Sequence, residues 1–580
     1  MAETLISPGI SMSEIDRSAI PARPLVAGAA ILGPTVKGPV NVPTKVTSFQ
    51  EYSVIFGTTF IPSSGSTVTS EFLTSMAVKD YFSQGGDSLL VTRVANSKAF
   101  KVAGNTIIYS SGSTEPTSTP FELRTLSAGA IMNSCNSATY VTGSGGVLPS
   151  GSADNLRFEI YNVDEDRGTF TLAIRRGNDD DKDKDILEEF RSLSLDPNST
   201  NYIAARIGDQ YTTAKVADAD DVYLDTVGSY TNKSRYIRVD KVLNPTPNYT
   251  IADKGKLPLE QGGAFYGATG LPGICYKADG SEETSKTALY FEDMTTEKTD
   301  YNQGVLPSDY NTAIDLLANA DEYQINLISA PGLLNADTIG SLIGLAEGRG
   351  DCLAIVDIQP YGASVADVTN AASGFNSSYG TTYWPWLQLY SSTGKQEWCP
   401  ASIVIPGMYI WSDKQTAPWY APAGMTRGGI SAIQAARKLT KAQRDALYVK
   451  SVNPIATMPG AGLVAYGQKT LQKKASALDR VNVRRLLIEV KNTVRNMASG
   501  LLFEQNTEAL RNAFRAQLDP YLSGIVKRNG LVGYSIDLSG NTSEAIDRNE
   551  FHCSVTLAPT RSIEYIYLTF TVTATGVSFD

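Results

Sequence analysis

The residues that could carry out chemistry are few and far apart along the chain. Its 580 residues include one histidine, His552, and five cysteines, none of which forms a Cys-x-x-Cys pair. Zinc sites usually draw on clustered cysteine and histidine, so the ordinary zinc ligand sets are missing here. His552 stands in an alternating segment, 551–557, which predicts a strand. We therefore expect reduced, mostly buried thiols and a histidine that belongs to a strand.

An acidic run between residues 179 and 185 has some features of a calcium loop. Asp179, Asp181 and Asp183 fit the first three ligand positions of an EF-hand. Position six is then Lys184, where the turn requires glycine, and position twelve is Phe190, where a glutamate should bind. The run therefore favours a solvated hairpin tip over a metal site.

Two glycine-containing segments come close to nucleotide-binding motifs. Residues 280–287 resemble a phosphate loop but lack its second glycine, the residue that lets backbone amides approach a phosphate. Gly460, Gly462 and Ala465 have the spacing of a dinucleotide turn, but no clear helix follows, so a tight strand connection is favoured. No Gly-x-Ser-x-Gly elbow is present, and one histidine leaves a hydrolase triad unsupported. The sequence therefore predicts no catalytic residue, cofactor, metal or small-molecule substrate, and we expect no enzyme.

Basic charge is concentrated in residues 437–528. This stretch has 17 Lys and Arg against 6 Asp and Glu, a net of +11, so the remainder must carry −21 for the chain to total −10. Such a chain can dock its basic part onto an acidic partner or onto an acidic part of its own neighbour. Solvated helix faces are the alternative for any one of these residues. Nucleic-acid binding through Arg484, Arg485, Lys491 and Arg495 is another, although aromatic residues that could stack on bases are sparse here.

Composition and patterning describe a folded chain of several domains. Hydrophobic residues make up 42% of the chain and charged residues 19%, and no apolar run approaches the ~18 residues of a membrane helix. No secretory signal is apparent at the start, so we expect folding in a cytoplasm. Strand, helix and strand within 25–98, and alternating helices and buried strands within 321–357, indicate a parallel sheet with crossover helices.

Changes in texture along the chain predict its division into segments. Residues 99–190 are rich in Gly, Ser, Thr and Asn with short alternating runs, which indicates an inserted β domain. Two amphipathic helices follow near the C-terminus, and their apolar stripes are most simply core. The predicted segments are an N-terminal arm at 1–24, an α/β domain at 25–98 continued at 191–436, the β domain at 99–190, an α+β domain at 437–568 and a C-terminal arm at 569–580.

Both ends of the chain have strand patterns. Ile10 and Met12 alternate with serines after a Pro-Gly pair. Near the C-terminus, Phe570 and Val572 continue a run in which apolar residues alternate with tyrosine and threonine. A terminal strand must find a sheet, either in its own domain or in another subunit, to which it lends an edge by β-augmentation.

Short distinctive segments are spread over most of the chain. They are Pro8, Gly9, Ile10, Glu14, Ile15 and Asp16; Gly33, Lys37, Gly38, Pro39, Val40 and Asn41; 48–57; 193–202; Arg349, Asp351, Ala354, Ile355 and Asp357; Ser378, Tyr379, Tyr383, Pro385 and Trp386; 421–424; 452–455; 483–485; and 503–506. Read together and in this order, they resemble the sheath protein family of contractile bacteriophage tails and related contractile injection machines. The chain departs from the family's pattern after Gly262 and Gly263, where an expected acidic residue is absent, and the insertion matches no particular member.

This resemblance implies a fold and an assembly. The fold would combine a β-sandwich insertion, a central α/β domain that is subtilisin-like in shape but not catalytic, and a C-terminal α+β domain nearest a tail tube. The assembly would consist of hexameric rings stacked helically around that tube, with both terminal arms donating strands to neighbouring subunits. For these arm contacts we predict Ile10, Met12, Ile15, Phe570 and Val572.

The resemblance also implies partners and a role. The partners would be copies of the chain itself, the tail tube protein, and baseplate and tail terminator proteins, in a virion tail sheath assembled in the host bacterial cytoplasm. Contraction of the sheath would drive the tube through the bacterial envelope. We predict that the basic C-terminal helices face the acidic tube or an acidic neighbour through Arg484, Arg485, Arg511 and Arg515. The competing hypothesis is a nucleic-acid-binding structural protein that uses residues 437–528.

Overall fold

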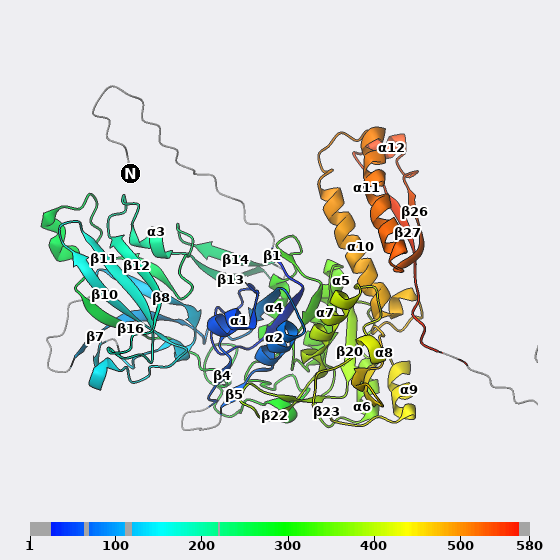
Figure 1. Ribbon diagram of the computed structural model, residues 1–580, viewed down its shortest axis with the longest axis horizontal. Coiled ribbons are helices and arrows are strands. Elements are labelled where there is room, and N and C mark those ends of the chain that lie inside the picture. The colour runs from blue at the N-terminus through cyan, green and yellow to red at the C-terminus, as the bar shows by residue number, and fades with distance from the viewer. Residues whose placement is uncertain are drawn as a thin grey trace, which may run out of the picture.

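The computed structural model describes residues 25–62, 69–110, 119–137, 139–218, 221–565 and 567. In this part the chain forms three bodies: a β domain, a central α/β domain beside it and an upright C-terminal body on the opposite side (Figure 1). The predicted arm residues Ile10, Met12, Ile15, Phe570 and Val572 lie outside the described residues. Their strand-forming role stays a prediction.

The central domain is built on an eight-stranded, largely parallel sheet in the order β25-β24-β20-β19-β18-β2-β6-β3. The strands from β24 to β6 run parallel, whereas β25 and β3 pair antiparallel at the two edges. Both faces are buried, because Ala29 and Ile31 of β2 enter one core while Ala30 and Leu32 enter the other. The strands are β2 (Ala29–Gly33), β3 (Thr44–Val46), β6 (Leu89–Arg93), β18 (Leu327–Ser329), β19 (Leu353–Val356), β20 (Gly380–Trp384), β24 (Asn453–Met458) and β25 (Gly462–Ala465).

Helices cover both faces of this sheet, as the sequence predicts for parallel strands with crossover connections. The helices of the first face are α1 (Phe49–Phe56), α2 (Leu73–Ser83) and α7 (Ile405–Gln415). Those of the second face are α4 (Asp309–Leu316), α5 (Ala336–Arg349), α6 (Val365–Ala372) and α9 (Lys441–Val449). The predicted parallel sheet is confirmed.

The β domain is a sheet in the order β12-β11-β10-β16-β7-β8-β15, with β9 paired to β7. The short helix α3 (Ile203–Ile207) packs against both edge strands, so that sheet and helix enclose one apolar core. A bridge between Lys101 and Thr269 places the points where the chain enters and leaves this domain side by side. The strands are β7 (Val102–Ser110), β8 (Phe121–Ala128), β9 (Thr139–Thr142), β10 (Leu156–Asp164), β11 (Thr169–Arg176), β12 (Ile186–Ser194), β15 (Ile237–Val242) and β16 (Gln261–Tyr266).

This β domain extends further along the chain than predicted. Its predicted end at residue 190 falls inside β12, and β15 and β16 rejoin the same sheet much later. Because β16 pairs with β10 on one side and β7 on the other, its place depends on contacts that are distant in the sequence. The hairpin of β13 (Tyr211–Asp218) and β14 (Asp221–Val227) lies on this late connection and contacts α4.

The C-terminal body packs two long helices against a β-hairpin. The apolar stripes of the helices meet in its core, where Leu486, Val490, Phe514, Leu518 and Leu522 are buried, so that prediction is confirmed. The predicted start at residue 437 is wrong, because α9, β24 and β25 belong to the central domain. The elements of the body are α10 (Val481–Ser499), α11 (Glu508–Lys527), β26 (Leu531–Asp537), α12 (Ser543–Asp547) and β27 (Ser554–Pro559).

The glycine at the centre of the β domain gives a test of its packing. A Cβ built on Gly263 would lie 1.9 Å from the Phe158 ring, whereas a Cβ on the helical Gly344 would meet nothing within 4 Å. We expect Gly263→Ala to lower the unfolding free energy of the β domain by about 3 kcal/mol because the core cannot take the extra methyl group. Gly344→Ala should raise the stability of the central domain by about 0.5–1 kcal/mol, because alanine favours the helix. Denaturant unfolding of both variants measures this contrast, and a Gly263→Ala protein as stable as the wild type would contradict the packing.

Candidate interaction surfaces

The single histidine occupies an exposed irregular segment, not a strand as predicted. His552 lies two residues before β27, and its Nε2 lies 2.9 Å from the Glu550 carboxylate. Among the described residues, no group of three or more His, Cys, Asp or Glu side chains is arranged to hold a metal ion. All five cysteines are free thiols, four of them buried and Cys553 partly buried, as expected.

A hydroxyl and a carboxylate meet in the central domain. Ser402 donates its hydroxyl to Asp357 Oδ2 at 2.5 Å and its backbone N–H to Oδ1 at 3.3 Å. Burial raises the pKa of Asp357 to about 6, against the lowering effect of these hydrogen bonds. Both side chains are buried, and His552 lies in the C-terminal body. Because the pair is buried, it has no access to a substrate, and its place beside β19 is that of a structural contact.

The acidic run at 179–185 connects β11 to β12, so the predicted hairpin is confirmed. Its first residue is not solvated, however. Asp179 is buried, and it accepts hydrogen bonds from Arg175 Nε at 2.7 Å and Arg157 Nη1 at 3.2 Å. Two guanidinium groups thus occupy the carboxylate that a calcium ion would need.

The two glycine motifs also have structural explanations. Gly460 and Gly462 lie at the turn between the antiparallel strands β24 and β25, as the alternative of a strand connection predicted. Residues 280–287 begin in a turn closed by a bridge between Tyr276 and Glu282, and they do not lead directly into an α-helix as a phosphate loop would.

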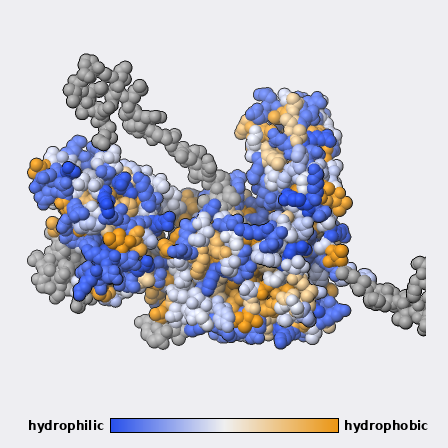
Figure 2. Space-filling view, in the orientation of Figure 1, coloured by the Kyte–Doolittle hydropathy of each residue, from blue (hydrophilic) through white to orange (hydrophobic). Residues whose placement is uncertain are grey.

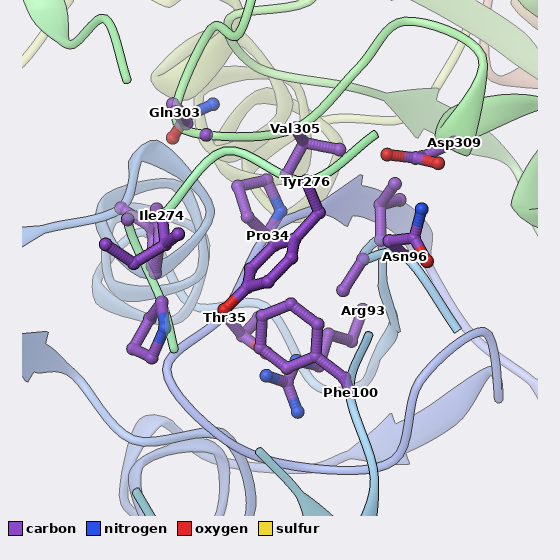
Figure 3. A pocket seen from close by; sticks show the side chains of 16 residues that line it. Pro34, Thr35, Arg93, Asn96, Phe100, Ile274, Tyr276, Gln303, Val305 and Asp309 are labelled. Carbon is purple, nitrogen blue, oxygen red and sulfur yellow. The ribbon is translucent and has the colours of Figure 1, made fainter. Parts of the chain in front are cut away.

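A buried arginine marks the joint between the β domain and the central domain. Arg93, at the end of β6, donates from Nη1 to the carbonyl oxygens of Gly38 at 2.6 Å and Ala128 at 2.8 Å. Its guanidinium lies 4.9 Å from the centre of the Phe100 ring, and burial lowers its pKa to about 9 (Figure 3). The adjoining cavity holds about 20 Å³, which is room for about one water molecule. This site joins two domains and is too small to bind a substrate.

Arg484 and Arg485 do not lie where the sequence analysis predicted them. They are 4% and 1% exposed. Arg485 forms a paired contact with Asp413 of α7, with Nη1 to Oδ1 at 2.8 Å and Nη2 to Oδ2 at 2.5 Å. Arg484 lies 4.0 Å from the centre of the Tyr379 ring and donates a hydrogen bond to Ser378 Oγ. Both arginines therefore hold the root of α10 against the central domain, and neither is free to face a tube or a neighbour.

The other two predicted arginines lie on α11. Arg515 is exposed, and Arg511 is half-buried and donates from Nη1 to Asn506 Oδ1 at 2.7 Å. They stay candidates for a contact with a partner. Together with the two buried arginines, they show that the long helices present less free positive charge than their sequence suggests.

A further set of exposed positive charges lies around α9, and sequence reasoning did not single it out. The side chain of each member is exposed, and within the part of the chain that the structure describes none of them forms an ion pair. Lys473 places the following loop beside α6, because its Nζ donates to the Ser373 carbonyl. We call this set the α9 basic surface: Arg437, Lys438, Lys441, Lys450, Lys473 and Lys474.

The hairpin of the C-terminal body has open edges. Within the described residues, β26 and β27 pair with each other antiparallel and with no further strand. One side of the hairpin packs on the helices through Tyr534, Ile536, Val555 and Leu557. Unpaired backbone N–H and C=O groups on the outer edges can accept a strand from another chain.

One face of the molecule, shown in Figure 2, carries hydrophilic residues over all three bodies, with hydrophobic residues between them. Among the described helices, none combines the length and apolarity that crossing a membrane requires. Contacts of this face with partners would therefore involve charged and polar groups.

The C-terminal body, with the loop before it, corresponds to a known domain. Residues 473–573 match the family model described as the phage tail sheath C-terminal domain. Residues 473–573 are therefore similar to a phage tail sheath C-terminal domain, and we call them the sheath domain for that similarity. In the described part, the sheath domain takes in α10, α11 and both strands of the open hairpin.

Curated relatives extend this likeness beyond the sheath domain. The tail sheath protein of Vibrio phage KVP40 is 31% identical over 293 residues, which are 46% of this chain and 43% of that protein. The tail sheath protein of Enterobacteria phage T4 is 30% identical over 306 residues, or 48% of this chain and 46% of that protein. The matches thus span less than half the length of these relatives. The resemblance to sheath proteins predicted from the sequence is confirmed.

One solved structure supports the fold over nearly the whole chain. The sheath tail protein Lin1278 from Listeria innocua has a TM-score of 0.51 and 9% identity, and covers 92% of this chain and 95% of its own. At this identity the likeness concerns the fold alone.

The buried arginine at the root of α10 can be tested against an exposed one on α11. We expect Arg485→Ala to lower the unfolding free energy by about 3–5 kcal/mol, because it leaves the Asp413 carboxylate half-buried without its partner. Arg515→Ala should change it by less than about 0.5 kcal/mol, because that side chain is exposed. Chemical denaturation measures both. Equal effects of the two substitutions would contradict a structural role for Arg485.

Proposed function

We propose that this chain is a structural subunit of a contractile tail sheath, which polymerises helically around a tail tube and contracts to drive the tube through a bacterial envelope. The observation that carries the proposal is the sheath C-terminal domain at residues 473–573. The tail sheath relatives that match about half of the chain support it. No enzymatic step is part of the proposal.

The subunits of this sheath are linked by exchanged strands. The open edges of the β26–β27 hairpin are suitable acceptors, and the alternating patterns at Ile10, Met12, Ile15, Phe570 and Val572 are suitable donors. A donated strand makes a heterologous contact, because its donor and acceptor are different surfaces. Repeated by rotation and rise, such a contact builds a helical tube of stacked hexameric rings.

Charge supplies a second kind of contact. The α9 basic surface, with Arg511 and Arg515, faces an acidic neighbour or an acidic tail tube, since the rest of the chain carries the opposite sign. Baseplate and tail terminator proteins complete the assembly, which forms in the host bacterial cytoplasm and becomes part of the virion.

Contraction is a rigid-body rotation of subunits from a kinetically trapped extended array. The paired contact between Arg485 and Asp413 suits this movement, because it holds the C-terminal body to the central domain while the exchanged strands act as tethers. The energy stored in the contacts between subunits of the extended array then drives the tail tube through the bacterial envelope.

Nucleic-acid binding, the competing hypothesis, is not favoured. The hypothesis assigns four cations to the phosphates of a nucleic acid, and two of them, Arg484 and Arg485, are buried. A third, Lys491, donates to the Tyr379 hydroxyl at 3.1 Å. Phosphate binding needs several accessible cations in one row, which this part of α10 does not present.

Removal of either arm tests strand exchange. Deletion of residues 1–17 or 569–580 should leave a folded, soluble monomer that cannot polymerise, because the cores lie between these segments. Negative-stain electron microscopy of the full-length protein should show striated tubes or six-fold rings, and circular dichroism should show the same folded content in all three proteins. Tubes of normal length from either truncated protein would disprove the exchange.

Charge reversal tests the α9 basic surface. Lys438→Glu, Lys441→Glu and Lys450→Glu together should abolish polymerisation at low salt, because the contact is then repulsive. The matched control reverses three exposed lysines elsewhere, Lys182, Lys233 and Lys286, for the same change in net charge. Sedimentation of polymer over a range of salt concentrations compares the two. Equal loss in both variants would show that net charge matters and this surface does not.

A further inference from the structure

Glu564 is a partly buried carboxylate in the last described stretch of the chain. After β27 ends at Pro559, the chain continues beside the central domain, where it contacts α9 (Figure 1). There the carboxylate accepts two hydrogen bonds from Arg480, Nε to Oε1 at 2.6 Å and Nη2 to Oε2 at 2.9 Å. The Tyr448 hydroxyl donates to Oε2 at 3.0 Å, and Gln468 Nε2 lies 3.3 Å from Oε1.

The donors to Glu564 come from three separate places in the chain. Tyr448 belongs to α9, Gln468 follows β25, and Arg480 is the residue before α10. Gln468 also donates to Ser562 Oγ at 2.6 Å, so a second residue of the same stretch is fastened. The Tyr448 ring lies 4.4 Å from Lys469 Nζ, which adds positive charge beside the carboxylate.

The neighbours of Glu564 contribute little apolar burial. Ile563 is 82% exposed and Tyr565 is 66% exposed, whereas the Glu564 side chain is 18% exposed. The position of this stretch therefore depends on its polar contacts. Burial acts to raise the pKa of Glu564, but the hydrogen bonds and charge of Arg480 hold it below its ordinary value. A bidentate guanidinium contact with additional donors is among the stronger polar contacts in proteins.

We propose that Glu564 is the anchor that fixes where the C-terminal strand leaves its subunit and how far it reaches. The inference rests on the proposed function, in which residues beyond the anchor are donated to a neighbour. An extended chain covers about 3.4 Å per residue, so the strand reaches at most ~54 Å from Glu564 to Asp580. Without the anchor, the reach grows to ~61 Å counted from Ser562, which Gln468 still holds, and to ~71 Å counted from Pro559 once that hydrogen bond also opens. The anchor thus limits which neighbouring sheet the strand can meet.

The anchor also determines which part of the subunit bears the load. Tension on a donated strand without an anchor would pull at Pro559, the residue paired with Leu531 at the end of the hairpin, and would peel β27 from β26 one pair at a time. With Glu564 held by Arg480, tension passes to the root of α10, which Arg485 and Asp413 hold to the central domain. Glu564 is therefore a positioning residue for strand donation.

Trypsin cleavage after Arg561 tests the anchor in the unassembled full-length protein. Arg561 is exposed and lies three residues before Glu564, so its cleavage rate reports the local release of this stretch. We expect Glu564→Ala to accelerate this cleavage about tenfold, and Glu564→Gln to give an intermediate rate because its amide oxygen still accepts hydrogen bonds. Glu544→Gln, an exposed carboxylate on α12, is the matched control and should behave as the wild type. An unchanged rate in Glu564→Ala would overturn the anchor.

Polymerisation of the same variants tests its role in strand donation. Electron microscopy should show tubes about tenfold shorter for Glu564→Ala than for the wild type, with partial recovery for Glu564→Gln, while circular dichroism shows the same folded content in all three monomers. Faster cleavage together with tubes of normal length and spacing would overturn the positioning role. If the wild type itself forms no tubes with a tube protein present, the proposed function fails, and the cleavage rates alone decide whether Glu564 anchors the chain.

Discussion

The burial of both faces of the central parallel sheet is the constraint on which the rest of the molecule depends. A parallel strand cannot return by a tight turn, so each crossover must carry a helix, and helices accumulate on both faces. Alternate residues of β2 accordingly enter two separate cores. With both faces covered, new structure can be added only at strand ends and edges. The β domain follows β6 and the sheath domain follows β25, and each has a core of its own.

The sequence predicts the parts of the fold whose signals are local. Continuous apolar runs indicate β2, β6 and β19, and stripes at helical spacing indicate α10 and α11. The extent of the β domain could not be predicted in this way, because β16 is assigned by its pairing with β10 and β7 and not by its own pattern. The start of the C-terminal body could not be predicted for the same reason, since β24 pairs with β20 in a sheet whose other parallel strands come earlier in the chain.

Charge is harder to locate from sequence than hydrophobicity, because a buried and an exposed arginine look alike. Arg485 is buried through its contact with Asp413, a residue of another helix that no local pattern connects to it. One signal was present: the first turns of α10 are apolar on several sides, with Val481, Leu486 and Ile488, and such a helix is buried all round. Glu564 had no comparable signal, since its donors are brought together only by the folded chain.

The bridge between Lys101 and Thr269 allows the β domain to be exchanged as a unit. The chain enters and leaves this domain at adjacent points. The domain can therefore be removed or replaced without moving the two ends of the central domain to which it is joined. Related chains that share the same scaffold can thus vary the inserted domain without changing the scaffold that carries it. For the engineer, the same pair of residues marks a place where a foreign domain with adjacent termini can be inserted.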